Sequence, residues 1–347
     1  MSPLLEADAP VARRSGASMG ILTAVGQTPL VCLQRIFPEN RFRLYAKLEM
    51  LNPGGSLKDR TALSMVMDGY AKGKIGRQTT IIESSSGNLG VGLAQVCRYL
   101  NLRFICVVDE RVTRMNVSML KAFGAEVHII KQPDGLDGDL LTARINLVRR
   151  LSETIEDCYW VNQYANEANS LAHHQTMREI HEALAGDVDY LFVATSTCGT
   201  LRGCSEYVRS RGLKTKVVAV DAAGSVIFGQ PPQSRLLPGH GASRMPELYR
   251  DGTEDTHLHV TDLDCVIGCH RLLHSEAILA GGSSGGIIAG VAKFRDQIVT
   301  GATCAAVLCD RGERYLDTIY SDDWRREHFG DVAHLLSGRY PTAETGD

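Results

Sequence analysis

The sequence predicts an α/β fold built on mainly parallel sheets. Short β-branched and apolar runs alternate with helical patterns along the 347 residues, which is the order that parallel strands with crossover helices require. The chain has 34 glycines and only 6% aromatic residues, which fits tight strand-to-helix loops better than a β-sandwich. Three loops rich in glycine, serine and threonine each follow an apolar run and precede a helical pattern.

The expected strands have short apolar or β-branched cores. In chain order they are Arg43–Leu48, Thr79–Glu83, Phe104–Val108, Val127–Ile130, Tyr190–Ala194, Lys216–Val220 and Ala305–Leu308. Helical patterns fill the intervals, for example Leu89–Leu100 and Leu201–Arg211. No repeat or low-complexity linker interrupts this alternation, so the whole chain reads as α/β.

The length predicts two domains, since a domain averages roughly 150 residues. We expect residues 1–160 to contain a smaller mobile domain, at about 50–160, while the segment around 20–45 packs on the larger domain. Residues 161–347 should form that larger domain. The first residues, MSPLLEADAPVARRSGAS, lack a continuous apolar stretch and predict a loose arm rather than a secretion signal. The polar tail after about residue 335 should fray.

Composition excludes several classes of protein. The net charge is −3, so nucleic-acid or membrane-surface binding has no electrostatic support. No apolar run approaches the roughly 18 residues that span a bilayer. The ten cysteines include no CxxC pair, and we expect reduced, mostly buried thiols in a cytoplasmic protein. Cys269, His270 and His274 could begin a metal site, but no second cluster completes it, so we expect no metal.

The three small-residue loops are Ser84–Gly90, Ser196–Gly203 and Gly281–Gly286. Their backbone N–H groups can approach a ligand closely, and a helix N-terminus favours an anion. Each loop alone is also typical of an ordinary strand-to-helix turn. The first reads GxxGxG rather than a dinucleotide fingerprint, and no GxxxxGK[ST] occurs. Together they predict a ligand with several anionic or polar groups.

A fourth segment, Asn52–Arg60, places Lys58 just before the helical pattern TALSMVMDGYAKG. A lysine there is often a plain solvated charge. A lysine partly desolvated near a helix N-terminus has a lowered pKa and can act as a nucleophilic amine. A reactive lysine, a phosphate-binding loop and polar groups for an aromatic ring are what pyridoxal phosphate requires, so the sequence predicts that cofactor.

The chain resembles the cysteine synthase/cystathionine β-synthase family of fold-type II pyridoxal-phosphate enzymes. The resemblance extends from Gly26 to Leu316 and rests on a set of segments in the family's order: GQTPL, KLEMLNPGGSLKDR, ESSSGNLGVGLA, STCGT, GGSSGG and RGERYL. It implies two domains, each with a mainly parallel twisted sheet flanked by helices, and a homodimer.

The resemblance also assigns roles residue by residue. It implies that Lys58 binds the cofactor covalently, that Asn88 hydrogen-bonds its 3′-oxygen and that Ser283 faces its pyridine nitrogen. The phosphate-binding loop corresponds to Ser196, Thr197, Cys198, Gly199 and Thr200. The positions that hold the substrate carboxylate correspond to Ser85, Ser86, Gly87 and Gln163.

A serine at the ring nitrogen has a mechanistic consequence. A hydroxyl does not keep the pyridine protonated as an aspartate would, so the cofactor is a milder electron sink. This favours loss of a β-leaving group, through an aminoacrylate, followed by addition of a nucleophile. Lys58 is then the natural base for the α-proton.

The sequence departs from ordinary cysteine synthases at several positions. Ser196 and Cys198 replace glycines of the phosphate loop, and Leu89 stands where threonine is usual. Three further segments resemble the branch that makes N-(2-amino-2-carboxyethyl)-L-glutamate: YWVNQYANEAN at 159–169, VDAAGSVIFG at 220–229 and LPGHGASR at 237–244. That branch supplies 2,3-diaminopropionate for siderophores and peptide antibiotics. The resemblance therefore implies O-phospho-L-serine as donor and L-glutamate as amine nucleophile.

A phosphate leaving group and a dicarboxylate nucleophile both need cations and hydrogen-bond donors. The candidates are Arg144, Arg244, Tyr164 and Ser196. Three of them have a simpler interpretation: Arg144 lies in an amphipathic pattern that predicts a solvated charge, Arg244 lies in an expected loop, and Tyr164 can be a packed aromatic. The neighbouring Arg149 and Arg150 are expected at the surface.

Three other functions remain open from the sequence. The first is a cysteine synthase that uses O-acetylserine or O-phosphoserine with sulfide, which needs no carboxylate-binding residues. The second is a lyase similar to threonine dehydratase, which would form a keto acid without an added nucleophile. The third is a non-catalytic binding module, against which the intact Lys58 argues.

Overall fold

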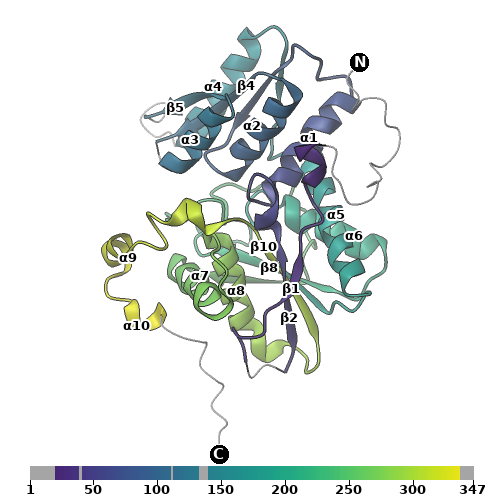
Figure 1. The fold of residues 1–347 in the computed structure, drawn as a ribbon, viewed down its shortest axis with the longest axis vertical. Coiled ribbons are helices and arrows are strands. Elements are labelled where there is room, and N and C mark those ends of the chain that lie inside the picture. Colours follow the sequence, from purple (N-terminus) through teal and green to yellow (C-terminus); the bar gives the residue numbers. More distant parts are fainter. Residues whose placement is uncertain (1–19, 39–40, 111, 133–139, 337–347) are drawn as a thin grey trace, which may run out of the picture.

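The computed structural model describes residues 20–38, 41–110, 112–132 and 140–336. Two sheets lie one above the other along the long axis of the molecule (Figure 1). The expected N-terminal arm and nearly all of the expected C-terminal tail lie outside the described residues. No helix in the described ranges is both long enough and apolar enough to cross a membrane.

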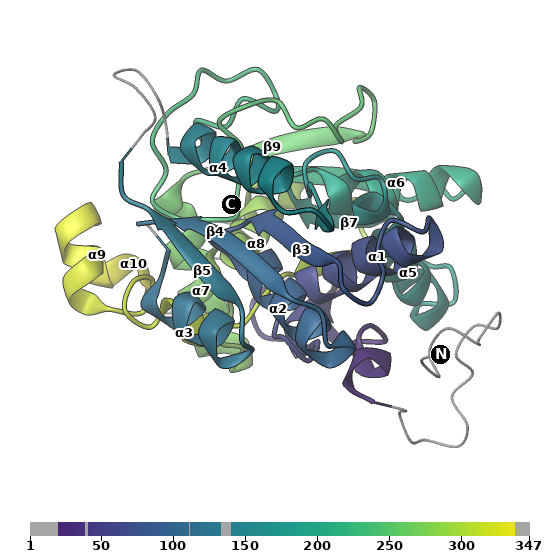
Figure 2. The same cartoon turned by 90° about the horizontal axis from the view of Figure 1, so that it is seen from above.

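The small sheet has four parallel strands in the order β5-β4-β3-β6. The strands are β3 (Thr80–Ser84), β4 (Phe104–Asp109), β5 (Glu126–Ile130) and β6 (Cys158–Trp160). One face is covered by α1 (Lys58–Ala71), α2 (Asn88–Leu100) and α3 (Arg114–Ala122), and the other by α4 (Leu140–Thr154), as Figure 2 shows. Because both faces are covered, β3 and β4 are buried along their whole length.

The large sheet has six strands in the order β1-β2-β10-β7-β8-β9, of which only β1 runs antiparallel to its neighbour. The strands are β1 (Leu30–Cys32), β2 (Arg43–Leu48), β7 (Tyr190–Ala194), β8 (Lys216–Ala222), β9 (Thr256–Val260) and β10 (Thr303–Leu308). In Figure 1, α5 (Ala168–Ala183) and α6 (Gly199–Ser210) lie on one face, and α7 (Asp262–Glu276) and α8 (Gly282–Phe294) lie on the other.

The sheets are built from separate stretches of chain. The small sheet uses residues between β3 and β6, whereas β1 and β2 join the large sheet beside β10. The chain returns to the large sheet through α5, after β6. The last helices, α9 (Asp322–Phe329) and α10 (Ala333–Leu336), lie outside α7 and bury their apolar side chains against the large-sheet core.

The α/β class is confirmed, and every expected strand forms. Boundaries differ by a few residues: α1 begins at Lys58 rather than after it, and α6 begins at Gly199 rather than Leu201. Both helices therefore start inside the small-residue segments. The short strands β1, β6 and β9 were not predicted.

A buried ion-pair network fixes the start of α1. The guanidinium of Arg60 donates to Glu49 (2.7 and 2.8 Å) and to Glu179 on α5 (2.7 and 2.8 Å). Lys47 on β2 adds a 2.6 Å pair with Glu179. Burial alone would raise the pKa of Glu179, but its hydrogen bonds to Arg60 and Lys47 outweigh it and hold the pKa at about 2. The network thus ties β2, α1 and α5 together two residues from Lys58.

Candidate active site

Every candidate site residue borders one cavity of about 1060 Å³ between the two sheets. Its walls include Lys58, the Ser85–Asn88 segment, the 196–200 loop and Ser283. Arg144, Gln163, Tyr164 and Arg244 border it as well. Three strands of the two sheets, β3, β7 and β10, end at this cavity, as expected for α/β proteins, which bind ligands at the carboxyl ends of strands.

Lys58 is the first residue of α1, and its backbone N–H donates to Ser56 Oγ at 3.2 Å. Its side chain lines the cavity. Burial lowers the pKa of the Lys58 amine, although the carboxylate of Asp310 partly opposes this. A lowered pKa increases the fraction of neutral amine, which is the form that attacks an aldehyde.

The Ser85–Asn88 segment connects β3 to α2 and is held from several sides. Ser85 Oγ accepts from the N–H of Gly90 at 3.1 Å, so the hydroxyl caps the first turn of α2. Asn116 on α3 donates to the Ser86 carbonyl at 3.1 Å. The amide of Gln163 donates to the Ser84 carbonyl at 3.1 Å. These hydrogen bonds therefore hold the loop from α2, from α3 and from the segment after β6.

Arg144 is not the solvated surface charge that its helical pattern favoured. Its side chain is 12% exposed and pairs with Asp109 at 3.2 Å. One of its nitrogens donates to Ser86 Oγ at 2.7 Å. The helix α4 therefore delivers a guanidinium to the cavity wall beside the expected carboxylate site. Arg149, on the same helix, is exposed and also borders the cavity.

The 196–200 loop follows β7 and opens α6. Thr197 Oγ1 accepts from Asn169 Nδ2 at 3.2 Å, and Thr200 Oγ1 lies 3.3 Å from His173 Nε2. Both partners belong to α5. A side chain at Gly199 would overlap the Asn169 amide, so only glycine allows this close approach. The N-terminal N–H groups of α6 and the two threonine hydroxyls form a suitable cradle for a phosphate.

Cys198 adopts a left-handed backbone conformation, with φ of 64°, at the N-cap of α6. This conformation favours glycine, the residue that the resemblance places there. The thiol is buried, and burial raises its pKa well above the ordinary value. It is therefore a neutral group at physiological pH.

Ser283 lies in the first turn of α8, next to Cys309 at the end of β10. Its hydroxyl hydrogen-bonds the Cys309 thiol. Both residues line the cavity together with Lys58. A hydroxyl at this place can approach a ring nitrogen without supplying a charge.

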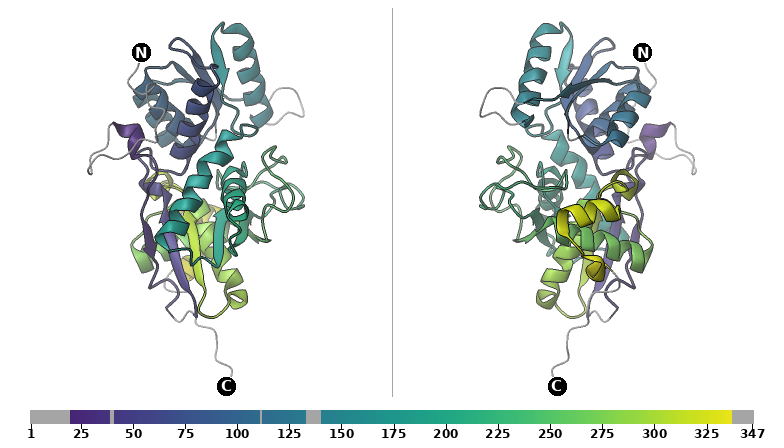
Figure 3. Two further views of the ribbon diagram at one scale, coloured as in Figure 1. Left: turned by 90° about the vertical axis from the view of Figure 1, so that its right-hand side faces the viewer. Right: turned by 90° about the vertical axis from the view of Figure 1, so that its left-hand side faces the viewer.

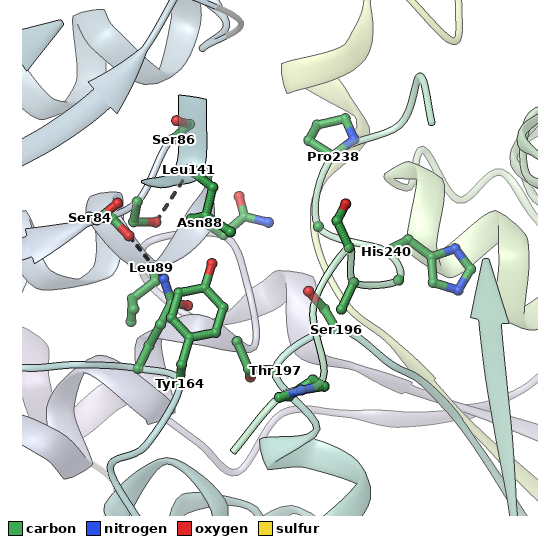
Figure 4. A pocket seen from close by; sticks show the side chains of 18 of the residues that line it. Ser84, Ser86, Asn88, Leu89, Leu141, Tyr164, Ser196, Thr197, Pro238 and His240 are labelled. Carbon is green, nitrogen blue, oxygen red and sulfur yellow. Dashed lines mark hydrogen bonds between the residues drawn. The ribbon is translucent and has the colours of Figure 1, made fainter. Parts of the chain in front are cut away.

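Tyr164 and Ser196 come from opposite sides of the cavity, and Figure 4 shows both facing its interior, with Asn88 near them. Tyr164 follows β6, whereas Ser196 follows β7. Burial raises the pKa of the Tyr164 hydroxyl, which therefore stays protonated and can donate. The tyrosine is thus a cavity residue rather than a core aromatic.

Residues 233–247 form the outer wall on the large-sheet side. They belong to the long connection between β8 and β9, which stands out from the large sheet below α4 in Figure 3. Arg244 on this connection donates to Thr142 Oγ1 on α4, which bridges the two sides of the cavity mouth. His240 lies behind it, buried, with Nε2 3.0 Å from the Val220 carbonyl.

Sequence reasoning assigned no role to several cavity residues: Asp109, Asn116, Arg235, His240, Asp310 and Arg314. Arg314 belongs to the RGERYL segment at 311–316 and Asp310 directly precedes that segment, so their place in or beside a family-like motif was the available signal. The proposed start of a metal site has other partners: Cys269, His270 and His274 each approach a backbone carbonyl.

Comparison with known families identifies the family of this chain. The model of the family described as pyridoxal-phosphate dependent enzyme matches residues 21–310. The chain belongs to the pyridoxal-phosphate dependent enzymes. It is thus an enzyme with pyridoxal phosphate as its cofactor, related to the cysteine synthases and cystathionine β-synthases.

Three similar solved structures are enzymes. O-ureido-L-serine synthase is 30% identical, with a TM-score of 0.81 over 88% of this chain and 98% of that one. The O-acetylserine dependent cystathionine β-synthase from Helicobacter pylori is 28% identical, with a TM-score of 0.81 over 88% and 99%. A hydrogen sulfide-producing enzyme from Fusobacterium nucleatum is 29% identical, with a TM-score of 0.80 over 86% and 100%.

The residues around the cavity fit this family's cofactor. Lys58 offers an amine with a lowered pKa, and the α6 N-terminus with Thr197 and Thr200 offers donors for a phosphate. Ser283 offers an uncharged hydroxyl.

Proposed function

We propose that this enzyme catalyses β-replacement on O-phospho-L-serine with L-glutamate, giving N-(2-amino-2-carboxyethyl)-L-glutamate and phosphate. The observation that carries the proposal is the cavity's size together with the arginines that border it. At about 1060 Å³ it is at the upper end of small-molecule sites, roughly 300–1,000 Å³. Arginines border it on both sides, from α4 and from residues 233–247. Such a cavity can hold a cofactor and two anionic amino acids.

The residues have distinct tasks in this reaction. Lys58 holds the cofactor and, once released from it, takes the α-proton of the donor on Nζ and later returns it. When bound, the cofactor supplies an electron sink for the charge left at the α-carbon. The Ser85–Gly87 segment and Gln163 bind the donor's carboxylate, and Asn88, the 196–200 loop and Ser283 hold the cofactor.

The atoms balance without a further reagent. The bond between the donor's β-carbon and its phosphate oxygen breaks, and a bond from that carbon to the glutamate nitrogen forms. The proton taken from the α-carbon returns to the α-carbon, and one proton of the glutamate ammonium leaves with the hydrogen phosphate. The product is a secondary amine with three carboxylates, a precursor for 2,3-diaminopropionate supply in siderophore or antibiotic biosynthesis.

The arginines favour an amino-acid nucleophile over sulfide. Arg144 borders the cavity from α4, and Arg244 borders it from the connection at 233–247. Tyr164 and Ser196 add neutral hydrogen-bond donors inside the cavity. A sulfide nucleophile has no carboxylate for these groups to bind. The charges thus match a phosphorylated donor and a dicarboxylate nucleophile.

The test is product analysis with competing nucleophiles. The purified enzyme, loaded with pyridoxal phosphate, is incubated with O-phospho-L-serine and equal concentrations of L-glutamate and sulfide, and the products are identified by mass. We expect the glutamate adduct as the main product. Cysteine as the main product would show a sulfhydrylase, and pyruvate in the absence of any nucleophile would show a lyase.

A donor control completes the test. O-acetyl-L-serine replaces O-phospho-L-serine in a parallel incubation, and the two kcat/KM values are compared. We expect the phosphorylated donor to be preferred, because the arginines bind its phosphate dianion. Preference for the acetylated donor would overturn the assignment of the leaving group while leaving the glutamate assignment open to the first experiment.

A further inference from the structure

Asn88 is held at both ends of its amide by the large-sheet side of the cavity. Its Nδ2 donates to Asp310 Oδ2 at 2.7 Å, and its Oδ1 accepts from the guanidinium of Arg314. Asn88 begins α2 beside the small sheet, whereas Asp310 and Arg314 follow β10 of the large sheet. The three residues are therefore brought together from positions more than 200 residues apart, since 222 separate Asn88 from Asp310.

The charges on either side dictate which way the amide faces. A guanidinium is a donor only, and an ionised carboxylate is an acceptor only. Turning the Asn88 amide by half a rotation would place its NH₂ against Arg314 and its oxygen against Asp310. Both contacts would become repulsive, so one orientation is strongly favoured.

Asp310 is itself buried and fixed. It is 1% exposed, and its Oδ2 also accepts from the Tyr315 hydroxyl at 2.6 Å. Its Oδ1 has no hydrogen-bond partner within the described part of the chain and lies against Gly281, where any side chain would overlap it. Burial raises the pKa of Asp310, but a proton would sit on the partnerless Oδ1, so Oδ2 accepts in either protonation state.

This arrangement leaves one N–H of Asn88 without an assigned acceptor. The amide nitrogen carries two hydrogens, and Asp310 uses one. Asn88 borders the cavity next to Lys58, so the second hydrogen is available to an acceptor on the cofactor ring. With the amide reversed, the same position would present an oxygen to that acceptor instead.

We propose that Asp310 is a positioning residue, which acts with Arg314 to fix the Asn88 amide so that it donates to an oxygen of the bound pyridoxal phosphate. The inference depends on the cofactor and on Asn88, and not on the identity of the two substrates. It also explains Gly281, since this glycine provides the space that the carboxylate occupies.

A double-mutant cycle on cofactor binding tests the proposal. Apoprotein of the wild type, Asp310→Ala, Asn88→Ala and the double variant is titrated with pyridoxal phosphate alone. The dissociation constant is measured by equilibrium dialysis, and the visible absorption of the bound cofactor is recorded. Thermal unfolding of each apoprotein checks that it is folded.

We expect Asp310→Ala to weaken cofactor binding about 2- to 10-fold, the effect of one neutral hydrogen bond, and to change the absorption of the bound cofactor. In the Asn88→Ala background the same change should alter binding less than twofold, because the residue acts through Asn88. Equal losses in both backgrounds would show a merely structural role and overturn the proposal. So would wild-type binding by Asn88→Ala.

A second variant keeps the cycle informative if Asp310→Ala fails to fold. Asp310→Asn retains the shape of the side chain and can still accept from Asn88 through its oxygen, but it no longer excludes the reversed amide. We expect a smaller loss than with alanine, and again none beyond twofold in the Asn88→Ala background. A loss that persists there would contradict the proposal. Because no amino-acid substrate is present, the result is independent of the glutamate experiment.

Discussion

At the scale of single residues, the proposed reaction depends first on Lys58. In that reaction this lysine supplies both the link to the cofactor and the base for the α-proton, so Lys58→Ala should reduce turnover by several orders of magnitude. The side chain lines the cavity rather than the core, so the variant should remain folded. Steady-state rates and circular dichroism check the two expectations. Retained activity with normal cofactor absorption would mean that another lysine is used.

We propose Ser196 as a determinant of substrate choice. It replaces a glycine of the usual phosphate loop and faces the cavity opposite Tyr164. Ser196→Gly removes one hydrogen bond, worth about 0.5–1.5 kcal/mol to a neutral partner or about 1.5–3 kcal/mol to a charged one. We expect kcat/KM for glutamate, or the preference for the phosphorylated donor, to decrease by a factor of between a few and about 100.

The cofactor content of the Ser196→Gly variant is the control for that measurement. We expect it to stay at the wild-type level, because the α6 N-terminus and the threonines remain. Loss of pyridoxal phosphate would assign Ser196 to the phosphate cradle alone. Wild-type kinetics with both donors and with glutamate would show that Ser196 has no role in substrate choice and only shapes the loop.

At the scale of elements, Glu83 joins β3 to the segment after β6. Its carboxylate accepts from the N–H groups of Ser84 (2.7 Å) and Gln163 (3.1 Å). Burial raises the pKa of Glu83 to about 7, although these N–H groups lower it. The folded protein therefore binds a proton here more tightly than the unfolded chain, and this group's contribution to stability falls as pH rises from about 4.5 to about 7.

Glu83→Gln removes that titration. Between pH 5 and 7.5, the free energy of unfolding of the variant should improve relative to the wild type by about 2 kcal/mol, whatever the constant cost of the altered hydrogen bonds. Burial also raises the pKa of Asp59 to about 7. This residue remains in both proteins, so the free energy of unfolding of the variant still falls as pH rises, although less steeply. Urea unfolding across this range provides the comparison. Parallel curves for the two proteins would contradict the role of Glu83.

The buried network around Arg60 gives a second prediction for the elements. Arg60→Leu leaves the carboxylates of Glu49 and Glu179 buried without the guanidinium that they share. The free energy of unfolding should fall by about 3–5 kcal/mol. The exposed pair of Arg103 and Glu126 is the matched control, because Arg103→Ala should cost only about 0.2–1 kcal/mol. Chemical unfolding measures both. Equal losses in the free energy of unfolding for the two variants would mean that the buried Arg60 network contributes no more to stability than an exposed ion pair.

The elements also show what the sequence could predict. Strands such as Tyr190–Ala194 are fully apolar and were located to the residue. The missed strands β1 and β6 have three residues each, and the edge strand β9 reads THLHV, so none carries a long apolar pattern. The loops Ser84–Gly90 and Ser196–Gly203 were predictable because they follow β3 and β7, whereas Gly281–Gly286 follows the helix α7. The contact of Asn88 with Asp310 was not, because it depends on how two distant sheets meet.

At the scale of the whole molecule, we expect the substrate to draw the two sides of the cavity together. The segment proposed to bind the carboxylate belongs to the small-sheet side, and the loop proposed to bind the phosphate belongs to the large-sheet side. A donor that contacts both should favour a closed state, with the small-sheet part moving as a domain and water excluded from the reaction. We expect a decrease in radius of gyration by X-ray scattering when O-phospho-L-serine is added. Superimposable profiles would argue against closure.

The central claim is that phosphate leaves and glutamate nitrogen takes its place on the same carbon. The direct measurement uses ¹⁵N-labelled L-glutamate and O-phospho-L-serine with the holoenzyme, following phosphate release and the labelled product by mass in the same samples. The account predicts one ¹⁵N-labelled N-(2-amino-2-carboxyethyl)-L-glutamate for each phosphate, and neither product with Lys58→Ala. Phosphate release that proceeds without label in the product, with pyruvate or cysteine in its place, would contradict it.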